Sequence, residues 1–330
     1  MEDNSDLDRV TELWDRTARE RALSPVQGWL DSPLVLEGYV QPTVSGAPHV
    51  NWLIALAQRL KIPKTTSWLS LGCGSAGLEI FAAGEGLFQS LTAYDVSEAS
   101  LDQARKAAAA KGISNLEFRA GDFHRVELPP SAYDVVLMNM SLHHVKELRR
   151  VLEGVERTLT PGGYLLVNEF IGPRQFQFTD LQLSIVRDLL AAMPASWRQD
   201  ITSGDVKTEY RRMPVEHWNV ADPSEAIRSD VIVEELRRQF RIVERIDYGG
   251  TILNLLLEHI IHNFDASDEK DVGVIRLLGV FEAILIREGV LPSDFTVMAM
   301  RKRNAAVGKV RALFDRPREE SNDEEPAAGG

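Results

Sequence analysis

The chain has 330 residues, 44% of them hydrophobic, and a formal net charge of −12, which suits a globular protein with a sizeable core. The first eight and the last sixteen residues each carry a net charge of −4, so the residues between them carry only a small net charge. This distribution gives no reason to expect nucleic acid or an anionic membrane as the main partner. The single cysteine, Cys73, excludes an intrachain disulfide and a multi-cysteine metal cluster.

The sequence also bears on the compartment. Its first residues are acidic and lack the basic-then-apolar order of a secretory signal. No apolar run approaches the roughly 20 residues that a membrane-spanning helix needs. We therefore expect a protein of the reducing cytoplasm, a monomer or homodimer, with neither a nucleic-acid nor a membrane partner.

Residues 1–62 are predicted to be mainly helical. Apolar residues near the start follow helical spacing, and a second apolar stretch covers residues 50–60. Glycines and prolines between these stretches predict a loop. The first helix is indicated by Leu7, Val10, Leu13 and Trp14, and the loop by Gly38, Pro42, Gly46 and Pro48.

From Ser67 onward, short apolar runs alternate with helical patterns, which predicts a parallel sheet covered by helices on both faces. The predicted strands are Trp68–Leu71, Leu91–Tyr94, Leu116–Phe118, Val135–Met138 and Tyr164–Val167, and the clearest helices between them are Glu98–Lys111 and Val145–Leu159.

The alternation stops after Gly172. Residues 173–240 form an insertion too long for a plain connection, so we expect it to shape a site. The predicted elements from here on are helices Leu181–Met193 and Val231–Phe240, a strand Arg241–Tyr248, helices 252–263 and 271–288, and a last strand Phe295–Met300.

Five segments result from this division. They are an N-terminal helical lid (1–62), a nucleotide-binding core (63–172), an acceptor-site insertion (173–240), closing strands and helices of the core (241–303), and an acidic tail (315–330) predicted to be disordered.

A glycine-rich turn follows the first predicted strand. Gly72, Gly74 and Gly77 match G-x-G-x-x-G, where glycine permits a tight turn and close approach of a ligand to the backbone. Asp95 ends the next strand, 23 residues after Gly72, and can accept hydrogen bonds from both hydroxyls of an adenosine ribose. Taken alone, this pattern fits either a nicotinamide cofactor or S-adenosylmethionine.

Further motifs follow the later strands. Gly121-Asp122-Phe123 offers a carboxylate for an adenine amino group and a ring to pack beside it. The fourth strand ends in Asn139-Met140-Ser141-Leu142-His143-His144, and Leu159-Thr160-Pro161-Gly162-Gly163 leads into the fifth. In this order and spacing, the motifs resemble those of the class I S-adenosylmethionine-dependent methyltransferases, strongly over residues 65–170 and more weakly over 241–302.

This resemblance implies a doubly wound, seven-stranded α/β sheet of order 3-2-1-4-5-7-6 with the last strand antiparallel, and S-adenosylmethionine as cofactor. Ser70 departs from the family pattern, which often has an acid there. Gly72 and Gly74 would line the methionine part, Asp95 would hold the ribose, and Asp122 would meet the adenine. The full set of implied cofactor-binding residues is Ser70, Gly72, Cys73, Gly74, Asp95, Val96, Asp122, Phe123 and Asn139.

Three side chains at the ends of strands four and five are candidates for catalysis. The sulfonium already activates the methyl group, so the protein must align a nucleophile and remove its proton. His143 aligns with the catalytic histidine of plant-type O-methyltransferases and is the leading candidate base, with His144 second. Glu169 is the third: it would bind an acceptor, pair with His143, or only bridge to Arg174 or Arg187.

Two other patterns have weaker functional meaning. Ser224–Ser229 follows Asp222-Pro223 and is predicted to be a short capped helix. His259 and His262 have the i, i+3 spacing of metal ligands, but no third ligand is evident in the sequence. We therefore predict no metal site.

The leading hypothesis is metal-independent methyl transfer to a small-molecule acceptor, at a hydroxyl oxygen. The alternatives are N- or C-methylation, and a noncatalytic S-adenosylmethionine-binding regulatory subunit. A nicotinamide-dependent dehydrogenase is the weakest reading.

Overall fold

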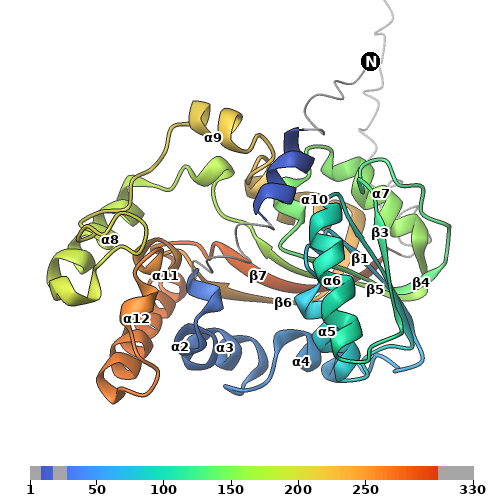
Figure 1. Ribbon diagram of the computed structural model, residues 1–330, viewed down its shortest axis with the longest axis horizontal. Helices are drawn as coiled ribbons and strands as arrows, with labels where there is room; N and C mark the ends of the chain where they lie inside the picture. The colour runs from blue at the N-terminus through green and yellow to red at the C-terminus, as the bar shows by residue number, and fades with distance from the viewer. Residues whose placement is uncertain (1–8, 18–27, 304–330) are drawn as a thin grey trace, which may run out of the picture.

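The computed structural model describes residues 9–17 and 28–303, so the acidic tail 315–330 lies outside the described residues. A seven-stranded sheet of order β3-β2-β1-β4-β5-β7-β6 forms its centre (Figure 1). Strand β7 runs antiparallel to both β5 and β6, and the other pairs are parallel, so the predicted topology is confirmed. The strands are β1 Ser67–Leu71, β2 Ser90–Asp95, β3 Leu116–Ala120, β4 Tyr133–Asn139, β5 Leu159–Phe170, β6 Phe240–Gly249 and β7 Phe295–Lys302.

Alternating side chains of the central strands enter two hydrophobic cores, one on each face of the sheet. In β4, Val135 and Leu137 belong to one core, whereas Val136 and Met138 belong to the other, and all four are fully buried. This period of two is the side-chain alternation of an extended strand. It explains why a central strand reads as a continuous apolar run.

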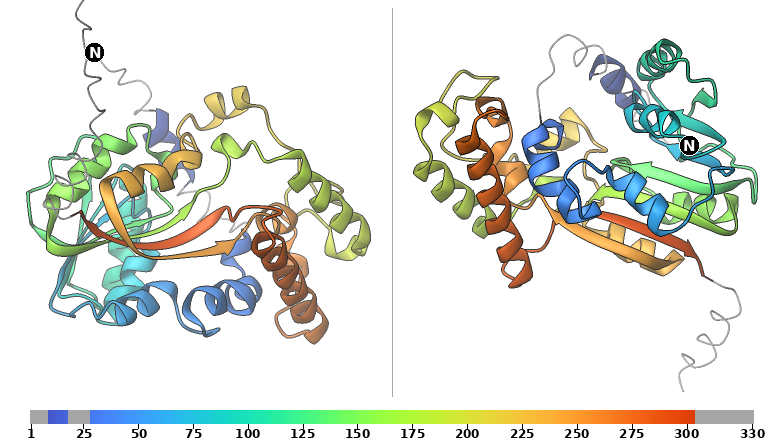
Figure 2. Two further views of the ribbon diagram at one scale, coloured as in Figure 1. Left: turned by 180° about the vertical axis from the view of Figure 1, so that it is seen from behind. Right: turned by 90° about the horizontal axis from the view of Figure 1, so that it is seen from below.

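Helices cover both faces (Figure 2). Helices α7 (Leu148–Thr158) and α10 (Ile232–Gln239) pack into the second core, and α4 (Trp52–Arg59) packs into the first. Helices α5 (Gly77–Gly84) and α6 (Glu98–Ala110) contact each other and β3. Among the described residues, no helix has both the length and the apolar character to cross a membrane.

The predicted loop around Gly38 and Pro42 is wrong, because residues 33–45 are helical. Helix α2 (Pro33–Val35) continues through a π-helical turn (Leu36–Val40) into α3 (Gln41–Ser45). Pro42 lies in the first turn of α3, where a proline is tolerated. Tyr39 packs closely on Gly279: a Cβ added at Gly279 would lie 2.7 Å from the ring of Tyr39. Tertiary packing thus overrides the local loop signals.

The helix predicted over 252–263 is present only in its first half, whereas the helices predicted near 181–193 and 271–288 are present. Helix α11 (Leu253–Leu257) stops early, and His259 has a φ of +62°, which a continuing helix cannot accommodate. The Lys207 amine donates to the carbonyls of Leu255 and Glu258, satisfying groups left open at the end of α11. The neighbouring helices are α8 (Asp180–Ala192), α9 (Val215–Ala221) and α12 (Glu269–Arg287).

Candidate functional site

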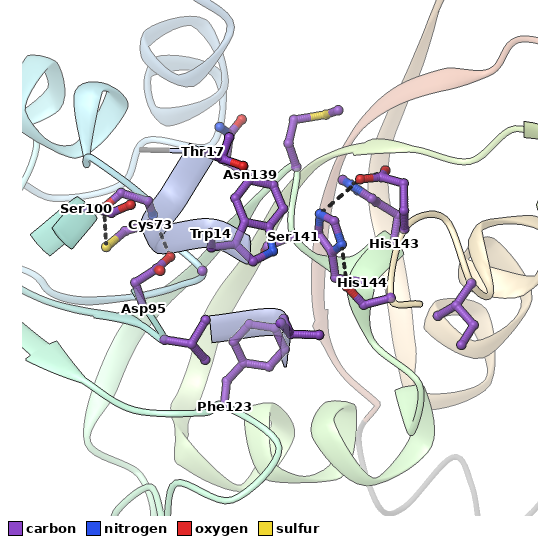
Figure 3. A pocket seen from close by; sticks show the side chains of 18 of the residues that line it. Trp14, Thr17, Cys73, Asp95, Ser100, Phe123, Asn139, Ser141, His143 and His144 are labelled. Atoms are coloured by element: carbon purple, nitrogen blue, oxygen red, sulfur yellow. Dashed lines mark hydrogen bonds and ion pairs between the residues drawn. The ribbon is translucent and has the colours of Figure 1, made fainter. Parts of the chain in front are cut away.

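An open cavity of about 1550 Å³ lies at the carboxyl ends of β1, β2 and β4, the ligand side of a parallel α/β sheet (Figure 3). Its walls come from the glycine-rich turn, helix 9–17, residues 28–31, and residues 219–227 of the insertion. One end, formed by residues 72–74, 95–96 and 122–123, is called the glycine-loop end. The other, formed by His143, His144, Ser224 and Glu225, is called the histidine end.

Gly72 turns the chain sharply after β1. Its φ is +74°, and a Cβ added there would lie 2.6 Å from the Cβ of Ser141. Gly74 has a φ of +53° with open space where its Cβ would be. Both positions therefore favour glycine, and backbone atoms of this turn line the cavity, together with Cys73.

Asp95, at the end of β2, holds this turn in place. Its Oδ2 accepts a hydrogen bond from the Gly74 N–H at 2.7 Å, and its Oδ1 accepts one from the Ser97 N–H at 2.9 Å. Burial raises the pKa of Asp95, and these backbone donors oppose that rise. Asp95 and the adjacent Val96 both line the cavity, and their contact with a ribose stays a prediction.

Helix 9–17 reaches both ends of the cavity. Asp15 accepts a hydrogen bond from the Ser97 hydroxyl at 2.6 Å, beside Asp95. Trp14 meets the ring of His144 edge-on, with 5.1 Å between ring centroids. Figure 3 shows the Trp14 ring between Asp95 and the two histidines. Helix 9–17 therefore lines the cavity, and its role as a lid stays a prediction.

Asp122 and Phe123 form a second wall of the glycine-loop end. Burial acts to raise the pKa of Asp122, but hydrogen bonds from the backbone and the ring of His124 bring it below its usual range. Asp122 is therefore an ionised acceptor at neutral pH. Phe123 lies beside the glycine turn, since a Cβ at Gly72 would be 3.4 Å from its ring.

Ser70 does not line the cavity, so its predicted cofactor contact is wrong. Its side chain is buried, and its hydroxyl donates to the Glu79 carboxylate of α5 at 2.6 Å. Burial raises the pKa of Glu79 to about 7, although the Ser70 hydrogen bond opposes the shift. The buried carboxyl group of Glu79, from helix α5, thus lies next to position 70, where the family often has an acid.

Asn139 ends β4 and lines the cavity. Its Oδ1 accepts from Asn168 Nδ2 at 2.9 Å, and Asn168 Oδ1 accepts from the Tyr248 hydroxyl at 2.7 Å. This chain of hydrogen bonds fixes the Asn139 amide through residues of β5 and β6. The next residue, Met140, has a φ of +53°, so the backbone leaves β4 under strain at the cavity wall.

Glu169 and His143 form a buried pair. His143 Nδ1 lies 2.5 Å from Glu169 Oε1. Glu169 is fully buried and also accepts from the N–H groups of Ser141 (3.0 Å), Leu142 (2.6 Å) and Phe170 (2.7 Å). Four hydrogen-bond partners therefore converge on the Glu169 carboxyl group and fix its position.

This arrangement decides between the roles predicted for Glu169. It pairs with His143, and no ion pair with Arg174 or Arg187 is recorded among the described residues. It lies outside the cavity wall, so the expectation that it binds an acceptor is wrong. Glu169 is a positioning residue that fixes the His143 ring.

The two histidines have opposite protonation tendencies. Burial is the largest single effect and lowers the pKa of His143, but the charge and hydrogen bond of Glu169, with smaller contributions from Glu225 and Asp222, together outweigh it and raise the pKa to about 9. Burial and the neighbouring His143 hold the pKa of His144 well below its usual range. His143 and His144 both line the cavity. One imidazolium and one neutral imidazole therefore stand side by side.

Glu225 is a site residue that the sequence analysis missed. Its Oε1 lies 3.6 Å from His143 Nε2, and its Oε2 lies 4.0 Å from His144 Nε2. The short helix predicted at residues 224–229 is wrong, because residues 223–228 form turns. Asp222 Oδ1 accepts from the Ser224 N–H, and the Ile227 N–H donates to the His143 carbonyl at 3.1 Å. These bonds place Glu225 beside the histidines.

The second predicted histidine pair is not a pair in the structure. His259 lines the cavity, with its Nδ1 3.5 Å from Asp200, whereas His262 is exposed in a separate 3₁₀ turn. The break after α11 separates them. Their helical spacing therefore has no functional meaning.

Comparisons with known proteins point to one family. A family model described as a methyltransferase domain matches residues 62–217. A demethylmenaquinone methyltransferase of Listeria monocytogenes is 30% identical over 118 residues, which are 36% of this chain and 50% of that protein. One from Tropheryma whipplei is 29% identical over 211 residues, which are 63% of this chain and 80% of that protein. The chain thus spans about half the length of the Listeria relative.

A comparison with solved structures extends over most of the chain. Geranyl diphosphate C-methyltransferase from Streptomyces coelicolor A3(2), solved with S-adenosyl-L-homocysteine, covers 90% of this chain and 97% of its own, at 12% identity and a TM-score of 0.49. A likeness this slight has no bearing on function.

Proposed function

We propose that this chain is a class I S-adenosylmethionine-dependent methyltransferase and that it transfers the methyl group of S-adenosylmethionine to a hydroxyl oxygen of a small molecule. The observation that carries this proposal is that one cavity joins the Gly72–Gly74 turn to His143, whose ring is fixed by Glu169.

The glycine-loop end fits an adenosine and a methionine chain. Gly72 and Gly74 keep the turn free of side chains, and Asp95 lies at the strand end where a ribose is held in sheets of this kind. Asp122 offers an ionised acceptor for an amino group, with Phe123 beside it. When bound, S-adenosylmethionine supplies an electrophilic methyl group. These residues of the protein bind both the adenosine and the methionine part of that molecule.

The histidine end supplies the proton acceptor. Because Nδ1 of His143 donates to Glu169, the lone pair of its neutral ring lies on Nε2, on the side of Glu225 and the cavity. A hydroxyl proton passes to Nε2 as the oxygen takes the methyl group, and the Glu169 carboxylate stabilises the imidazolium that forms. The ring must be neutral to accept a proton, so a pKa of about 9 predicts that turnover increases with pH up to that value.

The acceptor site lies between the lid and the insertion. Trp14 and Trp29 provide apolar walls, and Asn219 and Ser224 of the insertion provide polar groups. Such a mixture suits a small molecule with an apolar body and a few polar substituents.

The test is a pair of measurements on His143→Gln. We expect it to bind S-adenosyl-L-homocysteine in calorimetry as the wild type does. With methyl-labelled S-adenosylmethionine and a panel of hydroxylated, amine and carbon acceptors, turnover should fall by about 100-fold or more. His217→Gln, an exposed histidine away from the cavity, is the control and should be unaffected.

The outcomes separate the alternatives. A His143→Gln variant that retains most of its turnover would favour N- or C-methylation. Ligand binding without transfer to any acceptor in the panel would favour a noncatalytic S-adenosylmethionine-binding subunit. Absence of ligand binding by the wild type would overturn the cofactor assignment itself.

A further inference from the structure

Three metal-binding side chains converge at the histidine end. His143, His144 and Glu225 each offer one ligand atom, and these atoms all lie within 4.8 Å of one another. The two histidines follow β4, whereas Glu225 comes from the insertion. The three side chains are 8%, 15% and 19% exposed, so the group is shielded from bulk water but still lines the cavity.

The hydrogen bonds leave the right nitrogen of each ring facing the group. His143 Nδ1 is held by Glu169, so its lone pair is on Nε2. The Ser224 hydroxyl donates to Asp222 Oδ1 at 2.7 Å, so it accepts from His144 Nδ1 at 3.1 Å, which places the lone pair of His144 on Nε2 as well. Both Nε2 atoms lie next to Glu225. Metal-binding histidines are oriented in this way, by a carboxylate or another acceptor on the opposite nitrogen.

The charges favour a cation at this point. The carboxyl groups of Glu169 and Glu225 lie beside the two imidazole rings in a largely buried place. A divalent cation bound to two neutral imidazoles balances both carboxylates. An ion about 2.1 Å from three ligand atoms keeps them within about 4.2 Å of one another, so small side-chain rotations suffice.

We propose that His143, His144 and Glu225 form a binding site for a zinc-class divalent cation, and that an ion bound there blocks methyl transfer. Two imidazoles and one carboxylate suit zinc and its first-row neighbours, whereas magnesium and calcium prefer all-oxygen sites. The block rests on the proposed function: the ion takes the Nε2 lone pair that must receive the acceptor proton.

Binding is tested first, without activity. Metal-free protein is titrated with Co²⁺ as a spectroscopic probe and with Zn²⁺ in calorimetry. We expect one ion per chain, with Mg²⁺ not bound at the same concentration. Glu225→Gln should weaken binding by more than about tenfold. His259→Gln removes another imidazole of the same cavity and Cys73→Ser removes its thiol, and neither should change the affinity.

Inhibition is tested second, as the ratio of rates with and without Zn²⁺ in each variant. The wild type should be inhibited at the concentration at which it binds Zn²⁺, a chelator should restore its rate, and Glu225→Gln should need at least about tenfold more metal. The proposal is overturned if no ion binds, if binding survives Glu225→Gln, or if Cys73→Ser abolishes it. Turnover that requires the metal would instead overturn His143 as the base, while leaving the binding site intact.

Discussion

The two ends of the cavity are built by different means. The glycine-loop end is formed by backbone conformation and by carboxylates at strand ends within the continuous stretch from β1 to β3, as with Gly72 and Asp95. At the histidine end, side chains from distant parts of the chain pair with one another in a buried setting, as with His143, Glu169 and Glu225. The glycine-loop end can therefore be recognised from short stretches of the sequence. The histidine end exists only when the insertion is folded against the sheet.

The largest effect is expected from Gly72→Ala at the glycine-loop end. The new Cβ would lie 2.6 Å from the Cβ of Ser141 at a φ that L-residues rarely adopt. We expect the free energy of unfolding to fall by at least about 2 kcal/mol and binding of S-adenosyl-L-homocysteine to be lost in calorimetry. The matched control is Gly77→Ala, where nothing lies within 4 Å of the added atom. Equal behaviour of the two variants would contradict a backbone-built end.

Asp95→Asn should act on ligand affinity more than on stability. The amide loses the charge offered to a ribose, which corresponds to a decrease of about 10- to 100-fold in affinity for S-adenosyl-L-homocysteine. Glu98→Gln, at an exposed acid that begins the following helix α6, is the control. An unchanged dissociation constant for Asp95→Asn would place the ribose elsewhere.

Glu79 gives the glycine-loop end a pH-dependent stability. Its carboxyl has a pKa near 4.5 when unfolded and about 7 when buried, so the folded state binds the proton more tightly. The stability of the wild type relative to Glu79→Gln should therefore fall as pH rises from 4.5 to 7, and then level off. Chemical denaturation across that range measures it, with exposed Glu85→Gln as a variant that shows no such trend. A flat difference for Glu79→Gln would mean that Ser70 and its surroundings hold the carboxylate ionised.

The smallest effect is expected at the histidine end from Ser224→Ala. The variant removes the acceptor for His144 Nδ1 but leaves His143 and Glu169 in place. This hydrogen bond contributes about 1 kcal/mol to holding the His144 ring in place, so its loss should lower turnover severalfold. The affinity for the cofactor should not change. Ser203→Ala, at an exposed serine, should change neither. A loss as large as that of His143→Gln would make His144 the proton acceptor instead.

The difference between the ends also explains what the sequence could predict. All seven strands and the Gly72 turn are predicted from patterns of residues that lie close together in the sequence. All of them are present in the structure. Glu225 has no local signature, because its partners lie some 80 residues earlier in the chain. Ser70 was misplaced for a similar reason: only the packing of α5 reveals that Glu79 takes its hydroxyl inward.

Two errors in secondary structure share this cause. Residues 33–45 are helical because Tyr39 packs on α12, although their glycines and prolines indicate a loop. The stretch after α11 breaks because Lys207, from the insertion, binds the carbonyls at its end. In both places the deciding contact comes from a residue far away in sequence.

Helix 9–17 has a consequence for how such a chain acquires new acceptors. The same short helix supplies Trp14 against His144 and Asp15 against Ser97, next to Asp95. A substitution that reshapes it for another acceptor also disturbs the support of the ribose-side carboxylate. Divergence in acceptor preference should therefore accumulate in residues 219–227, which contact the two histidines, while helix 9–17 changes slowly.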